Sequence, residues 1–138
     1  MNQASLASVA PFIGRILIAV FFIPSGVEKI VYFPRTVAYA SGAGLPQPEV
    51  AVVIAIIMEV LVAGMLLVGW KARGAALALV LFCLATAFLF HNYWESPPDM
   101  QVMQHVNFYK NVAIAGGLLF VCAFGPGRLS LDARASAA

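Results

Sequence analysis

Charged residues are scarce in this chain of 138 residues. Eight Lys and Arg and six Asp and Glu make up only 10% of it, against about 25% in ordinary soluble domains. Hydrophobic residues reach 62%. So few charges cannot cover the surface of a soluble protein, and so apolar a chain does not stay unfolded in water. The composition therefore excludes a soluble enzyme, a nucleic-acid-binding protein and a disordered chain, and it indicates an integral membrane protein.

Motifs for common catalytic and metal chemistry are absent as well. The two cysteines, Cys83 and Cys122, form no CxxC or haem-attachment motif. Their expected depths in the membrane differ too much for a disulfide, so both are expected to be free thiols that pack as small apolar side chains. Neither His91 nor His105 has a third metal ligand at helical spacing, so no metal site is predicted. A glycine-rich phosphate loop and a nucleophile elbow are also missing.

Long apolar runs dominate the rest of the chain. A helix needs about 20 mostly apolar residues to cross a bilayer. In lipid each spanning segment must satisfy its own backbone polar groups, which favours helices. The prediction is an all-α integral membrane four-helix bundle. It forms a single membrane domain over residues 1–138, with spans at about 12–31, 50–70, 74–90 and 108–125.

Two further features modify this simple picture. Residues 34–41, in the first connection, are compatible with a short interfacial helix. Within the first span, Pro24-Ser25-Gly26 brings a proline that leaves the carbonyl of Val20 without its helical donor. We therefore predict that the first helix is interrupted or kinked at this point.

Basic residues are distributed unequally between the two sides of the membrane. With four spans, both termini and the 71–73 hairpin lie on one side of the membrane. The first and last connections lie on the other side. Because basic loops are retained in the cytoplasm, both termini are predicted to be cytoplasmic. The other side carries only Arg35 outside the helices, whereas the side of the termini carries Lys71, Arg73, Arg128 and Arg134.

One carboxylate lies where lipid cannot solvate it. Glu59 stands in the middle of the second span, and a charge at the bilayer centre costs roughly 2.5–3.5 kcal/mol on insertion scales. Glu59 is therefore either protonated or paired with a cation. The long side chain of Arg15, in the first span, makes an Arg15–Glu59 pair the favoured interpretation. Such a pair either fixes helix register or takes part in redox or proton chemistry.

A second group of polar residues gathers near the membrane surface opposite the termini. Among them, His91 follows the third span and Lys110 lies at the start of the fourth, and both lie near aromatic residues in the sequence. The aromatic residues are typical of an interfacial belt. The lysines are typical of side chains that extend to the lipid head groups. The alternative is a polar pocket between the helices. Its candidate residues are Arg15, Ser25, Lys29, Glu59, His91, His105, Lys110 and Asn111.

Five short motifs extend over most of the chain. The first three are Gly14-Arg15 with Ser25-Gly26-Val27-Glu28-Lys29, Glu59 after Gly44-Leu45-Pro46, and His91-Asn92-Tyr93-Trp94. The last two are Phe108-Tyr109-Lys110-Asn111 and Gly125-Pro126-Gly127-Arg128-Leu129-Ser130-Leu131-Asp132. In this order, over about residues 12–132, they resemble the DoxX family. The resemblance implies a multi-pass four-helix protein of the inner membrane.

The resemblance implies less about activity. The family is named for a subunit of an archaeal thiosulfate:quinone oxidoreductase, other members are linked to membrane redox and thiol-stress complexes, and distant relatives act as membrane chaperones or cargo receptors. One hypothesis is a quinone-linked subunit of a membrane thiol or sulfur redox system, with His91 and Lys29 or Lys110 binding the quinone carbonyls and Glu59 exchanging protons. The alternative is a non-enzymatic membrane scaffold or assembly factor. A pathway for small solutes or protons is a third hypothesis.

The same reasoning sets the expected partners. The lipid bilayer is the first of them, and nucleic acid is not expected. Electron transfer would need a quinone as cofactor or a partner redox subunit, because no flavin, haem or iron–sulfur motif is present. A homo-oligomer is the remaining possibility for a protein partner.

Overall fold

The computed structural model describes residues 3–136, and every regular element among them is helical. Four helices are long and apolar enough to cross a membrane, which confirms the predicted all-α membrane fold. Three short helices connect or follow them: α2 (Phe33–Gly42), η2 (Tyr93–Glu95) and α7 (Leu131–Ala135). The spans are α1 (Gln3–Val31), the continuous run α3 (Pro48–Ile56), η1 (Ile57–Val62) and α4 (Ala63–Val68), then α5 (Ala72–Phe90) and α6 (Pro98–Phe124).

Two local expectations can be compared directly with the helices. The short helix expected at 34–41 is present as α2, with Pro34 in its first turn, where a proline costs no hydrogen bond. The interruption predicted at Pro24 is wrong, because α1 is helical without a break through that residue. Proline is tolerated within membrane helices where neighbouring groups compensate for the lost hydrogen bond.

The last span is longer than its hydropathy indicates. It begins at Pro98, with Pro98 at the first helical position and Asp99 in the first turn. Both residues favour a helix start, since a proline needs no donor there and an acidic side chain complements the positive end of the helix dipole. The polar residues from 98 to 107, expected in a loop, therefore form the outer turns of α6.

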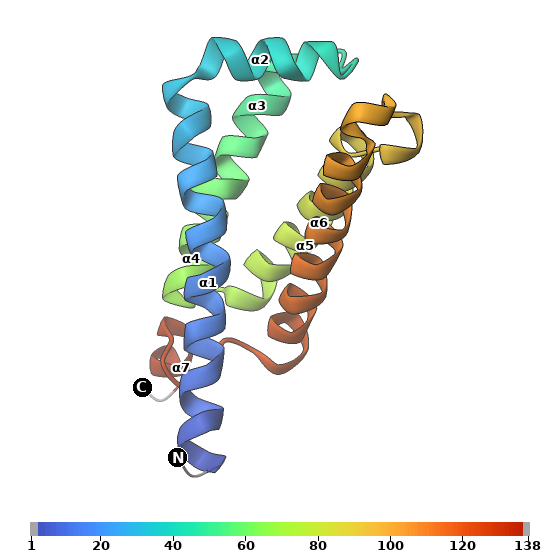
Figure 1. The fold of residues 1–138 in the computed structure, drawn as a ribbon. Helices are drawn as coiled ribbons and strands as arrows, with labels where there is room; N and C mark the ends of the chain where they lie inside the picture. Colours follow the sequence, from blue (N-terminus) through green and yellow to red (C-terminus); the bar gives the residue numbers. More distant parts are fainter. Residues whose placement is uncertain (1–2, 137–138) are drawn as a thin grey trace.

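The spans form two pairs. The helix α1 packs along α3, η1 and α4, and α5 packs along α6. The pairs meet through α4, η1 and α5 and diverge toward α2, which lies across that end of the molecule (Figure 1). Both termini lie at the opposite end, beside α7 (Figure 1). We call these the α2 end and the terminal end.

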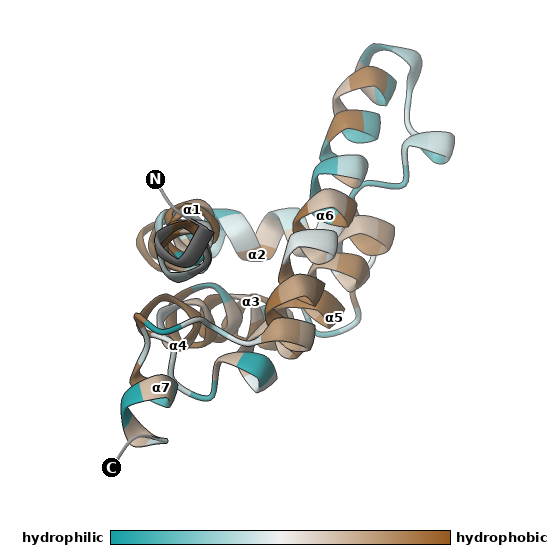
Figure 2. Ribbon diagram, turned by 90° about the horizontal axis from the view of Figure 1, so that it is seen from below, coloured by the Kyte–Doolittle hydropathy of each residue, from teal (hydrophilic) through white to brown (hydrophobic). Residues whose placement is uncertain are grey.

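Packing between the pairs depends on small side chains. Ala63, Ala76 and Cys83 are fully buried beside Leu66, Leu79 and Leu118, and small residues let membrane helices approach closely. Large apolar side chains such as Leu17, Leu81 and Phe120 instead face outward, each more than half exposed. The spans are mainly hydrophobic, and hydrophilic residues are concentrated in the connections and in the outer turns of α6 (Figure 2). This outer surface is suited to lipid.

Candidate functional site

A cavity of about 430 Å³ lies between the two helix pairs, at the α2 end. Cavities of roughly 300–1,000 Å³ commonly hold small molecules. Its walls are mostly apolar and aromatic, with a few polar side chains. Six of the eight sequence-predicted residues line it, namely Ser25, Lys29, Glu59, His91, Lys110 and Asn111. Arg15 and His105 do not.

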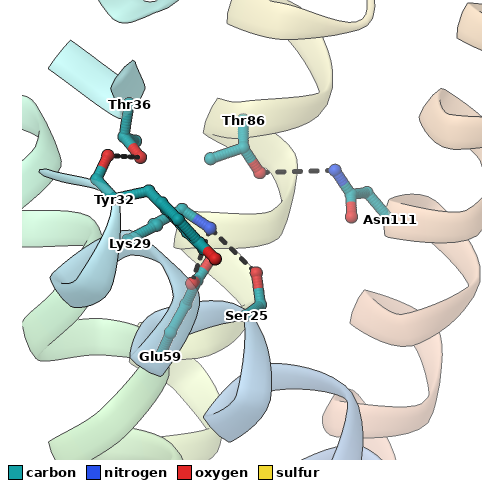
Figure 3. Close-up of polar contacts among 7 residues, drawn as sticks. All are labelled: Ser25, Lys29, Tyr32, Thr36, Glu59, Thr86 and Asn111. Atoms are coloured by element: carbon teal, nitrogen blue, oxygen red, sulfur yellow. Dashed lines mark hydrogen bonds and ion pairs between the residues drawn. The ribbon is translucent and has the colours of Figure 1, made fainter. Parts of the chain in front are cut away.

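One wall carries an ion pair. The Nζ of Lys29, on α1, lies 2.8 Å from Oε2 of Glu59 and 2.8 Å from Oγ of Ser25. The Glu59 side chain is 9% exposed and that of Lys29 is 25% exposed. The predicted Arg15–Glu59 pair is therefore wrong: the cation that neutralises Glu59 is Lys29, which lies nearer the α2 end of α1 (Figure 3).

Glu59 lies in a widened turn of its helix. Residues 57–62 form the π-helix η1 inside an otherwise α-helical span, and such wide turns often occur at functional sites. The turn faces Gly26 of α1: a Cβ built there would lie 2.6 Å from Cγ2 of Val60 and 2.9 Å from Cβ of Glu59. The absence of a side chain at Gly26 thus lets α1 approach η1 closely enough for Lys29 to reach Glu59.

We expect Gly26→Ala to lower the free energy of unfolding by about 1–3 kcal/mol, because the new methyl group would overpack this helix contact. Gly14→Ala is the matched control in the same helix, since a Cβ at Gly14 meets nothing within 4 Å. Thermal unfolding in detergent measures both. Equal melting temperatures for the two variants would show that the close approach at Gly26 does not constrain the fold.

The facing wall presents a neutral polar pair. Nδ2 of Asn111, on α6, donates to Oγ1 of Thr86, on α5, over 3.3 Å. The Thr86 hydroxyl lies 2.9 Å from the carbonyl oxygen of Phe82 and so can donate to it. Asn111 is buried. This pair and the Lys29–Glu59 pair lie on opposite sides of the cavity (Figure 3).

Two more predicted residues line the cavity nearer its edge. Nδ1 of His91 lies 2.8 Å from Oε1 of Gln104, which links the end of α5 to α6. Nζ of Lys110 donates to Oδ1 of Asn107 and also lies 5.3 Å from the ring centre of Phe21. The Lys110 ammonium thus connects α6 to α1. A lysine that only extended to the lipid head groups would not make this contact.

The helix α2 contributes to the cavity in a way that sequence reasoning missed. Tyr39 stacks on Phe90 of α5, with ring centres 5.6 Å apart and planes 16° apart. Thr36, on the same helix, also lines the cavity. The signal in the sequence for this is the short interfacial helix expected at residues 34–41. Through the stacked rings α2 covers the α2 end of the cavity.

Arg15 belongs to the terminal end instead. Its fully buried guanidinium donates from Nη1 to the carbonyls of Leu66, at 3.2 Å, and Leu67, at 2.6 Å, and from Nη2 to that of Leu129. Leu66 and Leu67 lie in the last turn of α4, where carbonyls lack α-helical partners, and the Leu66 carbonyl also accepts from the N–H of Gly69. Arg15 therefore joins α1, α4 and the segment after α6.

Asp132 completes the same junction. Its carboxylate accepts hydrogen bonds from the backbone N–H groups of Lys71, at 2.8 Å, and Ala72, at 2.9 Å. These are unsatisfied donors at the start of α5, which a carboxylate stabilises. The N–H of Asp132 in turn donates to the carbonyl of Gly69. The tail thereby closes the hairpin between α4 and α5.

His105 lies in an aromatic cluster on the outer turns of α6. Its ring centre is 4.8 Å from that of Tyr93 and 4.7 Å from that of Tyr109. Tyr93 also contacts Trp94 and Phe108. The helical start at Pro98 turns His105 toward this cluster and away from the cavity.

Cysteines and metal ligands add nothing to the cavity. Cys83 and Cys122 are free thiols, Cys83 being buried and Cys122 partly buried. Within residues 3–136, no group of three His, Cys, Asp or Glu side chains could hold a metal ion. The chemistry of the cavity therefore comes from its ion pair, amide, hydroxyl and imidazole groups.

The four spans and the cavity between their pairs define a small multi-pass membrane protein with a mainly apolar pocket that contains a buried ion pair. The DoxX family model matches residues 10–92, and the chain belongs to the DoxX family. The matched segment includes most of the polar residues of the cavity walls described above: Ser25, Lys29, Thr36, Tyr39, Glu59, Thr86 and His91.

Similar proteins agree with this assignment. Inner membrane protein YphA of Escherichia coli is 38% identical over 122 residues, which cover 88% of this chain and 87% of that protein. Inner membrane protein YqjF of the same organism is 34% identical over 128 residues, 92% of each chain. The chain is accordingly a multi-pass protein of the inner membrane.

A eukaryotic relative is larger. The Surfeit locus protein 4 homolog of Schizosaccharomyces pombe is 29% identical over 116 residues, 83% of this chain but 37% of that protein. No solved structure is significantly similar to the chain.

Proposed function

We propose that this chain is a quinone-binding subunit of a membrane thiol or sulfur redox system, and that the cavity at the α2 end receives the quinone head group. The observation that supports the proposal is the placement of hydrogen-bond donors on opposite walls of a mainly apolar cavity. A quinone ring is flat and apolar and has two carbonyl acceptors on opposite sides. Its chemistry, when bound, is the exchange of two electrons and two protons.

The donors have capacity left for such a ligand. An ammonium group has three N–H donors and a carboxamide has two. Lys29 uses two on Ser25 and Glu59, and Asn111 uses one on Thr86. Each wall therefore retains one N–H donor near the cavity. The aromatic rings of Phe22, Phe82 and Phe90 supply the apolar surface on which a quinone ring would rest.

The ion pair supports a role in proton exchange. Glu59 and Lys29 share a hydrogen bond at the cavity wall, and the Glu59 side chain is only 9% exposed, so a proton moved onto the carboxylate would stay beside the ligand. Electrons would come from a partner redox subunit. The exposed side chains of Ile54 and Leu89 at the cavity margin offer an apolar exit for the isoprenoid tail.

Binding of decylubiquinone to the purified full chain tests the proposal. We expect decylubiquinone to quench the tryptophan fluorescence of the wild type, which comes from Trp70 and Trp94. The Kd should rise about three- to tenfold in Asn111→Leu, the worth of one neutral hydrogen bond. Gln101→Leu is the matched control, because it also replaces an amide on α6 and does not line the cavity. Quenching that is equal in all three proteins would rule out this cavity as the quinone site.

The scaffold hypothesis has its own support. The chain is 29% identical over 123 residues to the ER-derived vesicles protein ERV29 of Saccharomyces cerevisiae, covering 89% of this chain and 33% of that protein. In this second proposal the Lys29–Glu59 pair fixes the register of α1 against η1, and the chain binds another membrane protein. A wild type that binds no decylubiquinone while the pair stabilises the fold would favour it.

Orientation forms a further part of the proposal. We infer from the excess of Lys and Arg at the terminal end that both termini are cytoplasmic. Periplasmic reporter fusions after Asp99 are expected to be active, and fusions after Arg73 inactive. The reverse pattern would move the quinone cavity to the cytoplasmic half of the membrane.

A further inference from the structure

A second cavity lies at the terminal end, far along the spans from the first. It has a volume of about 610 Å³ and lies among the α4–α5 hairpin, the end of α6 and the tail. Three basic residues line it, together with one acidic residue: Lys71, Arg73, Arg128 and Asp132. Neither the proposed function nor the family assignment involves this cavity.

The cations in this cavity have no ionic partner. The ion pair found within residues 3–136 is Lys29–Glu59, at the other end of the molecule. Asp132 uses its two carboxylate oxygens on the backbone N–H groups at the start of α5. Lys71 rests over the ring of Trp70 at 5.4 Å. The cavity therefore has excess positive charge.

The backbone holds these cations in place. The guanidinium of Arg73 lies over Gly125, where a Cβ would be 3.5 Å from both Nε and Nη2. Gly127 packs against Pro11 of α1, with a Cβ position only 2.9 Å from the proline ring. The φ angles are 83° at Gly125 and 80° at Gly127, in a region that residues other than glycine avoid. The loop before Arg128 is thus fixed against two helices.

The cavity also borders the lipid-facing surface. Phe124 lines it and is 78% exposed. Its ring stacks on Phe120 of the same helix, with centres 6.1 Å apart, and Phe120 also faces outward. A molecule in the cavity would therefore touch cationic groups on one side and the hydrocarbon region on the other.

We propose that this cavity binds the phosphate group of an anionic phospholipid. Guanidinium groups present several N–H donors in one plane, which suits the oxygens of a phosphate. Basic pockets at the ends of membrane helices bind anionic head groups in this way. The exposed Phe124 and Phe120 would contact the acyl chains, which free phosphate does not have.

Thermal unfolding of the purified, delipidated full chain in a neutral detergent tests the site. Short-chain phosphatidylglycerol is expected to raise the melting temperature, and phosphatidylcholine of the same chain length is not. Arg73→Gln and Arg128→Gln should each weaken phosphatidylglycerol binding about tenfold or more, the worth of a charge-assisted hydrogen bond. Each of the two single variants tests the prediction by itself, so the test still works if one of them fails to fold.

Arg134→Gln is the matched control, since Arg134 lies on α7 at the same end but does not line the cavity. It should bind the lipid as the wild type does, and an equal loss would reduce the effect to general surface charge and overturn the site. Thermal unfolding with sodium phosphate in place of the lipid is the last measurement. Stabilisation by phosphate alone, with no gain from the lipid, would overturn a phospholipid as the ligand.

Discussion

Lys29→Met is expected to lower the free energy of unfolding by about 3–5 kcal/mol, because it leaves the Glu59 carboxylate charged and unpartnered in a dry site. Lys29 is its cationic partner at 2.8 Å. Glu59→Gln should cost less, since Lys29 is the more exposed member of the pair. Thermal or denaturant unfolding in detergent measures these changes.

A double-mutant cycle separates pairing from two independent effects. Lys29→Met with Glu59→Gln should lose less stability than the sum of the single variants, by about 0.5–3 kcal/mol. Lys110→Met is the matched control, because Lys110 also lines the cavity but contacts the neutral groups Asn107 and Phe21 instead of a carboxylate. Strict additivity of the two cavity variants would mean that the pair contributes nothing to the fold.

Arg15→Met is expected to cost about 4 kcal/mol or more, since it removes three hydrogen bonds from a charged donor, and the carbonyls of Leu67 and Leu129 lose the guanidinium as their donor. Arg15→Lys should lose most of the same stability, because an ammonium cannot reach three carbonyls in the geometry of a guanidinium. Arg35→Met, an exposed arginine at the α2 end, serves as the control and should change little.

Two further readouts locate the effect of Arg15. Amide hydrogen exchange in 125–136 should accelerate in Arg15→Met, because the tail loses its attachment at Leu129. The losses from Arg15→Met and Glu59→Gln should add to within about 0.5 kcal/mol, as expected for residues that do not touch. A marked coupling between these two variants would restore a contact between Arg15 and Glu59.

Hydropathy alone suffices to predict the four spans, because lipid requires long apolar helices whatever their neighbours. The partner of Glu59 is a different kind of problem. Arg15 and Lys29 lie on α1 with similar facing, so only depth separates them. Arg15 lies level with Leu66 and Leu67. Leu67 is eight residues from Glu59, which corresponds to about 12 Å along the helix axis at a rise of ~1.5 Å per residue. That relative depth depends on how α1 is placed against η1, including the contact at Gly26, which a single sequence does not contain.

The candidate site shows the same division. Ser25, Lys29, His91, Lys110 and Asn111 could be predicted near one another because polar residues inside spans turn toward the protein interior. Thr86 and Tyr39 could not, because a threonine in an apolar run and a tyrosine near the interface have ordinary roles elsewhere. The acceptors of Arg15 are backbone carbonyls, which carry no residue-type signal at all.

The contact between Arg15 and Leu129 has a consequence for biosynthesis. The two residues are 114 positions apart, and helices enter the membrane in the order in which the ribosome makes them. The first helix is therefore inserted long before its last hydrogen-bond acceptor exists. Until the tail is translated, Nη2 of Arg15 lacks the carbonyl acceptor that it has in the finished protein. Chains that stall before Leu129 are expected to keep that defect, which gives membrane proteases a chemical means to distinguish them from finished molecules.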